Sequence, residues 1–223
     1  MPRKDLRYKR AFDLSILIVA HTFPLLVAVW AMLWTLIPAA IWLEDRGPVF
    51  YRQQRVGKNG QVFTVRKFRT MIPDAERHTG AVWSTTNDPR VTRVGRILRW
   101  TALDELPQLL NIWKGQMSLV GPRTERPEFH EKFVREIPGF QHRLLVRPGL
   151  TGLAQVKGAY DLDPAEKLRY DLEYIQTMSL WLDMKLILLS IRNTLLAKWD
   201  RPGKGFGSED LPAQDLPSRD VTE

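Results

Sequence analysis

Two adjacent carboxylates, Asp104 and Glu105, are the residues of this sequence best suited to do chemistry. They lie in the run LRWTALDELPQLLN, close to Arg96 and Arg99. Carboxylate oxygens bind divalent cations, and a carboxylate can attack phosphorus as a nucleophile. The same spacing also fits a capping box, in which Thr101 begins a helix and the acids occupy its first turn. Because a helix amino terminus also attracts anions, both interpretations stay open.

Three basic segments could supply cations to a phosphate-bearing substrate. Arg123 follows a Gly-Pro pair, a rigid turn that could aim its guanidinium at two phosphate oxygens. Lys67 and Arg69 lie at strand spacing and would share one face of a strand. Arg147 stands in the flexible loop RPGLTG. Each segment alone is as typical of an ordinary solvated loop as of a phosphate site.

Several common catalytic signatures are absent from the sequence. There is no GxxxxGK[ST] string, which excludes a P-loop kinase, and no HExxH or glycine-rich dinucleotide motif. The four histidines have no metal-like spacing. The absence of cysteine excludes a thiol nucleophile, thiolate zinc sites and a disulfide-built scaffold.

Length and charge limit the classes of protein and partner. The 223 residues suit one domain with appendages and are enough for a substantial core. Lys and Arg total 33 against 25 Asp and Glu, a net charge of +8 that favours anionic partners: nucleic acid, anionic lipid or a phosphorylated substrate. We expect no nucleic-acid partner, because the aromatic residues gather in apolar segments and do not alternate with basic loops.

An apolar segment from Ala11 to Leu43 is too long for a simple membrane span. As one straight helix it would measure about 50 Å, against a hydrocarbon core of about 30 Å. Pro24 predicts a kink, near which His21 and Thr22 could satisfy freed backbone groups. Basic residues flank both ends, and basic flanks stay cytoplasmic. We therefore expect a re-entrant helix–break–helix that returns to the cytoplasmic leaflet; a tilted span and a buried helix are the alternatives.

The middle of the chain predicts a small α+β body. PVFYRQQ and QVFTVRKF are rich in β-branched and aromatic residues and flank an Asn-Gly turn, which indicates a β-hairpin over residues 48–69. A short helix is expected from Pro73 and another over 94–100. The string SLVGPRTERP predicts a loop, and VRPGLTGLAQV predicts a glycine-bearing loop or a short strand.

Helices dominate the remainder. One is expected over 128–136, and a long helical stretch begins at Pro164 and ends in the apolar string LWLDMKLILLSIRNTLLAKW. That string fits an amphipathic helix on a membrane surface or a core-facing terminal helix. The composition of 201–223 predicts a disordered acidic tail. The expected organisation is a basic amino terminus with the re-entrant helix (1–45), a cytoplasmic catalytic domain with interfacial helices (46–200) and the tail.

Taken in order, these segments resemble the bacterial sugar transferase family, in particular its small monotopic polyprenyl-phosphate phosphoglycosyl transferases. The resemblance extends from about Lys9 to Trp199. It is carried by KRAFD, GPVFYRQQRVGKNGQVFTVRKFRTM, LRWTALDELPQLLNIWKGQMSLVGPRTERPEF, RPGLTGLAQV and SLWLDMKL. Two positions depart from the family pattern: Phe23 precedes Pro24 where serine is common, and Thr124 follows the Pro-Arg pair where a second proline is common.

The resemblance implies transfer of a sugar 1-phosphate from a UDP-sugar to undecaprenyl phosphate, with Mg²⁺ and release of UMP. This would be the first membrane step of glycoconjugate or exopolysaccharide synthesis, at the cytoplasmic face of the bacterial inner membrane. Asp104 would be the nucleophile that forms a covalent phosphosugar intermediate, with Glu105 assisting at the metal. Arg99 and Arg123 match residues taken to bind phosphate. The basic segments above complete the expected phosphate-binding set with Lys67, Arg69 and Arg147.

A function of another class also fits the charge and the apolar segments. A non-enzymatic basic scaffold, anchored in the membrane and bound to anionic lipid, would show salt-sensitive binding without turnover. In either case the interfacial helices could support a homodimer. The sequence does not identify the sugar.

Overall fold

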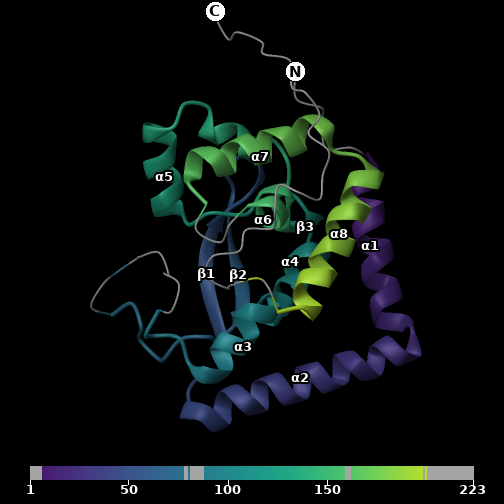
Figure 1. The fold of residues 1–223 in the computed structure, drawn as a ribbon, viewed down its shortest axis with the longest axis vertical. Coiled ribbons are helices and arrows are strands. Elements are labelled where there is room, and N and C mark those ends of the chain that lie inside the picture. Colours follow the sequence, from purple (N-terminus) through teal and green to yellow (C-terminus); the bar gives the residue numbers. More distant parts are fainter. Residues whose placement is uncertain (1–6, 78–79, 81–87, 159–161, 198, 200–223) are drawn as a thin grey trace, which may run out of the picture.

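Helices surround two small sheets in the computed structural model, which describes residues 7–77, 80, 88–158, 162–197 and 199 (Figure 1). The first elements are α1 Arg7–Thr22, α2 Pro24–Asp45, β1 Phe50–Val56, the 3₁₀ helix η1 Lys58–Gly60, β2 Val62–Phe68, α3 Arg93–Thr101 and the 3₁₀ helix η2 Leu103–Gln108. They are followed by α4 Leu109–Trp113, β3 Ser118–Val120, α5 Pro127–Glu136, the 3₁₀ helix η3 Phe140–Leu145, β4 Gly149–Thr151, α6 Leu153–Lys157, α7 Pro164–Thr177 and α8 Leu180–Leu195. The helix-rich α+β class is confirmed.

The predicted helix break lies between α1 and α2. Phe23 has extended backbone angles, and Pro24 occupies the first turn of α2, where its missing amide hydrogen costs nothing. His21 and Thr22 hydrogen-bond to main-chain carbonyls one turn earlier in α1. The His21 ring also stacks on Trp30 with 5.0 Å between ring centroids. The two helices therefore form a V with a packed corner (Figure 1).

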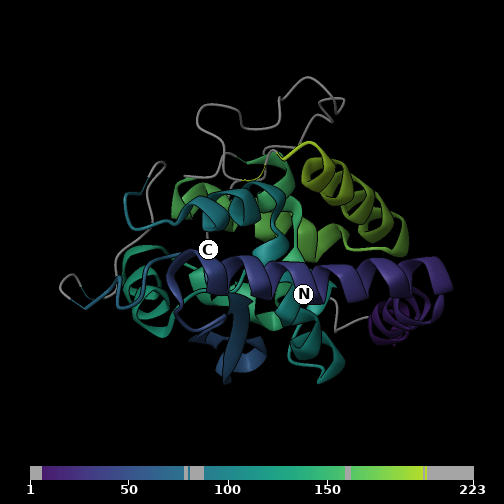
Figure 2. The ribbon, with the colours of Figure 1, turned by 90° about the horizontal axis from the view of Figure 1, so that it is seen from below.

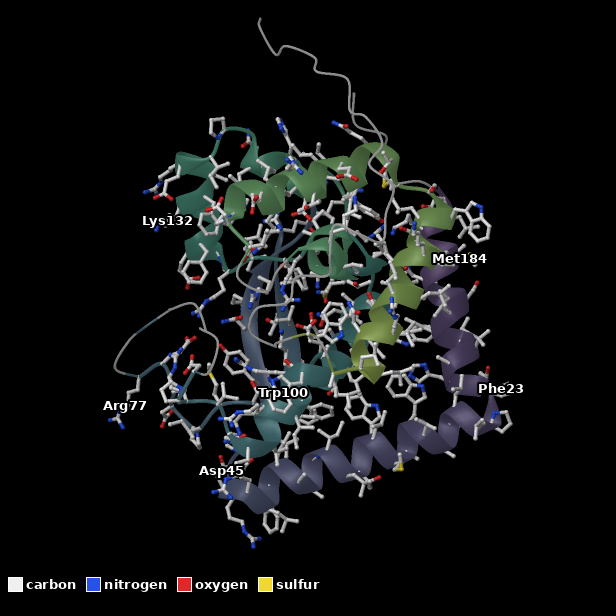
Figure 3. The ribbon with its side chains drawn as sticks, in the orientation of Figure 1. Phe23, Asp45, Arg77, Trp100, Lys132 and Met184 are labelled. Atoms are coloured by element: carbon white, nitrogen blue, oxygen red, sulfur yellow. The ribbon has the colours of Figure 1, made fainter. Side chains whose placement is uncertain are left out.

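Helix α2 runs along one side of the body, and in the view of Figure 2 it crosses in front of the body. It is the one helix of the described residues that is long and apolar enough to cross a membrane. Ile37 and Ile41 are buried against Phe68 and Leu98, whereas most of its apolar side chains between Phe23 and Asp45 have no protein cover (Figure 3). A helix that is apolar all round but packed on one side needs an apolar environment for the rest.

The β-hairpin is confirmed. Strands β1 and β2 pair antiparallel in the register Phe50 with Phe68 through Val56 with Val62. The connection is the predicted Asn-Gly turn, with Asn59 and Gly60 at φ 56° and 78°. Asparagine and glycine tolerate this left-handed region better than other residues.

A second sheet corrects the expected loop over SLVGPRTERP. Residues 118–120 form strand β3, which pairs in parallel with β4, Ser118 opposite Gly149 and Val120 opposite Thr151. The pairing continues past β3, where a Cβ on Gly149 would lie 2.1 Å from the main-chain nitrogen of Gly121. Glycine is therefore required at this crossing, and it brings the Pro-Arg segment next to β4.

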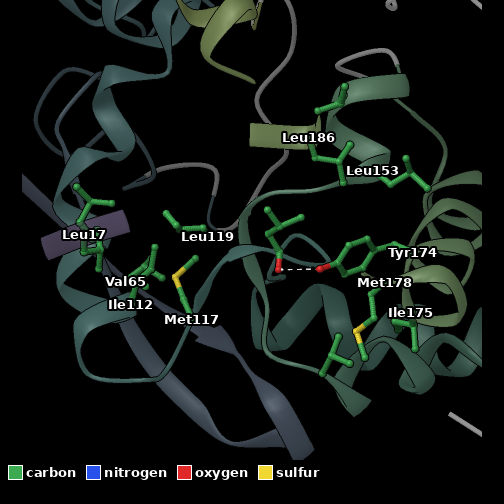
Figure 4. Packing of buried hydrophobic residues seen from close by; sticks show 14 of the residues in the cluster. Leu17, Val65, Ile112, Met117, Leu119, Leu153, Tyr174, Ile175, Met178 and Leu186 are labelled. Carbon is green, nitrogen blue, oxygen red and sulfur yellow. Dashed lines mark hydrogen bonds between the residues drawn. The ribbon is translucent and has the colours of Figure 1, made fainter. Parts of the chain in front are cut away.

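The main core lies between α1, the sheets, α7 and α8. Leu17, Ile112, Met117, Ile175 and Leu186 are all at most 2% exposed in one cluster (Figure 4). The Tyr174 hydroxyl donates a hydrogen bond to the carbonyl of Val120 in this core, 3.2 Å away. Apolar burial on this scale is the main stabilising contribution to the body.

A buried polar cluster, formed by Lys9, Asp183, Tyr174 and the carbonyl of Val120, fastens α1 to the body. The Lys9 ammonium donates to the other three at 2.8–3.0 Å. Lys9 is 4% exposed and Asp183 is 0% exposed. A buried charge is costly unless it is paired and hydrogen-bonded. The cluster therefore fixes the position of the first turn of α1 against the body.

Two other predictions are corrected. Pro73 begins a turn and not a short helix. The long helical stretch from Pro164 divides into α7 and α8, where the Ser179 hydroxyl caps α8 by accepting from the Leu182 amide. The outer face of α8 exposes Trp181 and Leu188, as expected of an interfacial helix. The predicted disordered tail, 201–223, lies outside the described residues.

Candidate active site

Asp104 and Glu105 lie in the first turn of η2, directly after α3. The capping-box interpretation is wrong, because Thr101 belongs to α3 and its hydroxyl donates to carbonyls of that helix. Ala102 then takes a left-handed conformation, φ 53°, and ends α3. The sharp turn between the two helices carries both carboxylates to the end of β2.

Glu105 is the better-paired carboxylate of the two. Its Oε1 accepts from Lys67 Nζ at 2.6 Å and from Arg123 Nη2 at 2.8 Å. Asp104 Oδ2 lies 4.0 Å from the same Lys67 nitrogen. Both carboxylate side chains are about nine-tenths buried. The structure thus brings together two predicted carboxylates and two predicted cations from β2, η2 and the loop after β3.

These surroundings move the two carboxyl pKa values apart. Burial raises the pKa of Asp104 above its usual range; the cations, Lys67 first among them, offset only part of this, and the charge of Glu105 adds to it. Burial acts on Glu105 in the same direction, but Arg123 and Lys67 outweigh it and hold the pKa of Glu105 well below its usual range. Neighbouring carboxyls with separated pKa values are typical of catalytic sites.

Arg99 reaches the site from the last turn of α3. Its Nε donates to the hydroxyl of Thr70 at 3.1 Å, and its charge lowers the pKa of Asp104. Thr70 was missed in the sequence analysis, although it stands next to the basic run that ends β2. A threonine that holds a guanidinium beside a carboxylate gives that guanidinium a defined direction.

One cavity of ≈ 1580 Å³ joins these groups. Its polar end contains the residues just described, Lys67, Thr70, Arg99, Asp104, Glu105 and Arg123. Helix α8 also borders the cavity, with the apolar Ile187, Ile191 and Leu195 and the polar Ser190, Asn193 and Thr194. The sequence analysis did not predict the role of Ile187, Ile191 and Leu195, although their spacing of four residues places the three side chains on one helix face.

Two predicted phosphate-binding residues have other partners. The Arg69 guanidinium forms a two-pronged ion pair with Asp45 at the end of α2, with distances of 2.6 and 2.5 Å, although the residue also borders the cavity. Arg147 Nε donates to the carbonyl of Gly115 at 2.8 Å, and Arg147 is not among the residues that border the cavity. Arg69 therefore joins α2 to the hairpin, and Arg147 joins two loops.

The donors suit a metal ion only together with a substrate. Among the described residues, no group of three or more His, Asp or Glu side chains is arranged to hold a metal. Asp104 offers one carboxylate at the cavity, whereas the Glu105 oxygens are engaged by Arg123 and Lys67. Mg²⁺ is commonly held by one or two carboxylates plus substrate phosphates. The residues present fit that mode, with Asp104 as the carboxylate.

Comparisons with known proteins identify relatives of this chain. The chain is 44% identical over 196 residues to the UDP-glucose:undecaprenyl-phosphate glucose-1-phosphate transferase of Caulobacter vibrioides, which covers 86% of this chain and 70% of the relative. It is 40% identical over 190 residues to the UDP-N-acetylgalactosamine-undecaprenyl-phosphate N-acetylgalactosaminephosphotransferase of Aeromonas hydrophila (84% and 43%). It is 40% identical over 208 residues to the undecaprenyl-phosphate glucose phosphotransferase of Komagataeibacter xylinus (87% and 37%).

The chain spans less than half the length of the last two relatives. Its match to the family model for bacterial sugar transferases covers residues 4–197, which includes every element described above. The chain belongs to the bacterial sugar transferase family.

Proposed function

We propose that the protein transfers a sugar 1-phosphate from a UDP-sugar to undecaprenyl phosphate and releases UMP. The observation that carries this proposal is the Asp104–Glu105 pair at a cavity that also contains Lys67, Arg99 and Arg123. Phosphoryl transfer depends on positioning and on neutralising the spread negative charge of the phosphate oxygens. Three relatives bear names that describe this type of transfer.

Asp104 is the proposed nucleophile. One of its carboxylate oxygens forms a bond to the sugar-bearing phosphorus of the UDP-sugar, while the bond from that phosphorus to the bridging oxygen breaks and UMP leaves with that oxygen. An oxygen of undecaprenyl phosphate then attacks the same phosphorus and displaces the Asp104 carboxylate. The raised pKa supports this assignment, because a more basic carboxylate is a better nucleophile once it is deprotonated.

The remaining groups bind and position. Arg99 and Arg123 are the proposed phosphate-binding residues, since a guanidinium fork matches two phosphate oxygens. Glu105 holds Lys67 and Arg123 beside Asp104, at 2.6 and 2.8 Å. Mg²⁺ held by Asp104 and the substrate phosphates would supply further neutralisation of charge when bound.

The proposed setting is the cytoplasmic leaflet of the bacterial inner membrane, with α1 and α2 as a re-entrant pair. Basic residues before and after the apolar segment support this arrangement. Most apolar side chains of α2 and the outer face of α8 are exposed. The cavity would then be open to a soluble nucleotide sugar while lying within reach of a lipid phosphate.

The test is UMP release by the membrane-reconstituted protein with a panel of UDP-sugars, undecaprenyl phosphate and Mg²⁺. We expect one or more sugars to support turnover and Asp104→Asn to reduce it to background. Glu131→Gln, an exposed acid on α5, serves as the control and should keep full activity. Without lipid acceptor, radiolabelled sugar phosphate should stay on the wild-type protein. Full activity of Asp104→Asn would exclude the nucleophile, and lipid binding without turnover would favour the scaffold.

A further inference from the structure

The loop that carries Arg123 is irregular, yet its backbone is held at successive residues. It connects β3 to α5, and the four carbonyls of residues 122–125 each accept a hydrogen bond from another part of the chain. The donor–acceptor pairs are Gly149 N with Pro122 O (2.9 Å), Arg143 Nη2 with Arg123 O (2.7 Å), Arg55 Nη1 with Thr124 O (3.1 Å) and Val56 N with Glu125 O (2.9 Å). The carbonyl of Arg123 itself depends on the side chain of Arg143.

Arg143 is suited to this contact by its burial and its partners. It is 4% exposed, and its Nε donates to Asp171 Oδ2 at 2.6 Å. Its Nη1 lies 3.7 Å from Glu125, and its guanidinium lies over the Phe140 ring, 4.7 Å from the centroid. A planar guanidinium can interact with Asp171, Glu125 and the Arg123 carbonyl at the same time, whereas a lysine ammonium lacks this forked geometry.

Neither Arg143 nor Asp171 borders the cavity that contains Asp104, whereas Arg123 does. Glu125, the other partner of Arg143 in this loop, borders the cavity as well, so Arg143 acts on the site through the loop that carries Arg123 and Glu125. From the backbone that Arg143 holds, the Arg123 side chain reaches Glu105 at 2.8 Å. A shift of that backbone would move the guanidinium away from Glu105 and from the phosphate it is proposed to bind.

We propose that Arg143, aligned by Asp171, is a positioning residue for Arg123. This inference rests on the proposed function for its catalytic consequence, but its structural part is independent of the reaction. Asp171 and Glu125 fix the direction of the Arg143 guanidinium, which in turn keeps Arg123 directed at Glu105.

The first test is a double-mutant cycle on UMP release. Arg143→Lys keeps the charge but removes the fork, and we expect kcat to fall about 10- to 100-fold, since a misplacement of about 1 Å can cost on the order of 10²-fold. In an Arg123→Ala background the same change should cost about twofold or less, because its effect passes through Arg123. Equal losses in both backgrounds would overturn the proposal.

The second test measures hydrogen exchange of the amides in segment 121–126. Arg143→Lys and the second variant, Asp171→Asn, should both increase exchange there while thermal unfolding remains cooperative. The matched control is Glu173→Gln, which removes the partner of Lys157 (3.0 Å) on the same helix as Asp171 and should leave exchange and kcat unchanged. Unchanged exchange in both test variants would refute the positioning role. A wild-type protein that releases no UMP would refute the proposed function, and the exchange result would still decide the role of Arg143.

Discussion

Asp104 and Glu105 are adjacent in the sequence, but their surroundings in the fold differ and suit them to different roles. Glu105 is pinned between Lys67 and Arg123 and stays ionised, so it organises the cations. Asp104 is buried beside that negative charge, which makes it the more basic carboxylate and the better candidate for covalent chemistry. Adjacent positions in a 3₁₀ helix point in different directions, which is enough to give the two carboxylates different partners and different roles.

The first residue-scale prediction concerns pH. Because Asp104 must be deprotonated to act and its pKa is raised, kcat/KM for the UDP-sugar should fall as the pH drops through a value above the usual range of an aspartate. Lys67→Met removes the cation that most lowers this pKa, so the acid limb should move to higher pH, on top of any loss at the plateau. Lys132→Met, an exposed change on α5, should leave the limb in place. An acid limb that moves to lower pH in Lys67→Met contradicts the assignment.

The sequence could predict which residues form the site, but it could not predict the contact partner of every basic side chain. Asp104, Glu105, Lys67 and Arg123 lie in short motifs that match a known family, so their meeting is expected. Arg69 looked equally suitable, but its partner Asp45 stands 24 residues earlier, at the end of a helix that sequence spacing does not place. Whether a basic residue faces substrate or a structural acid is decided by tertiary contacts.

The sequence predicted elements that have clear turn residues and strand-forming residues, but it did not predict the short strands. The β-hairpin follows from its Asn-Gly turn and its β-branched strands. Strands β3 and β4 have three residues each, which is too few to show alternation, and each needs a partner about 30 residues away. The helix start expected at Thr101 failed because that residue ends the preceding helix.

A prediction on stability belongs to the attachment of α1. Asp183→Asn leaves the Lys9 ammonium buried without its counter-charge, and breaking a buried pair in this way costs about 3–5 kcal/mol. The thermal unfolding temperature in detergent should drop accordingly. Glu136→Gln disrupts an exposed i,i+4 pair with Lys132 and should change the free energy of unfolding by about 0.5 kcal/mol or less. Equal effects of the two changes would show that the cluster does not fasten α1.

A second prediction at this scale tests the topology of α1 and α2. The sequence has no cysteine, so single cysteines at positions 4 and 58 can be labelled without background. A re-entrant pair keeps both positions on the cytoplasmic side, and a membrane-impermeant thiol reagent should label both only after the cells are opened. Labelling of one position in intact cells would demonstrate a spanning helix.

At the scale of the molecule, one cavity combines two kinds of surface. Its cationic end matches phosphates, and α8 contributes apolar side chains to its wall, together with the polar Ser190, Asn193 and Thr194. The exposed apolar residues of α2 and α8 give the molecule a second region without protein cover. The basic residues behind the net charge of +8 lie both at the site and at the two ends of the apolar segment.

The membrane attachment predicted from this surface is apolar and not only electrostatic. In a salt wash of about 1 M, where the Debye length is about 3 Å, charge attraction to anionic lipid is screened. The protein should stay in the membrane fraction and dissolve only with detergent, because in the proposed arrangement the exposed apolar side chains of α2 lie in hydrocarbon. Release by salt would favour a peripheral protein held by its basic residues.

The Lys9 cluster also has a consequence for the order of synthesis. Lys9 is synthesised before its partners, because Val120, Tyr174 and Asp183 follow it by 111, 165 and 174 residues. Since Val120 ends the strand that leads into the loop of Arg123, the full set of cluster contacts at that strand can form only after Asp183 in α8 has been synthesised. Contacts of such long sequence separation form slowly. A nascent chain that stops before α8 therefore contains α1 and α2 but lacks Asp183, the counter-charge of Lys9, and the attachment of α1 to the body stays incomplete.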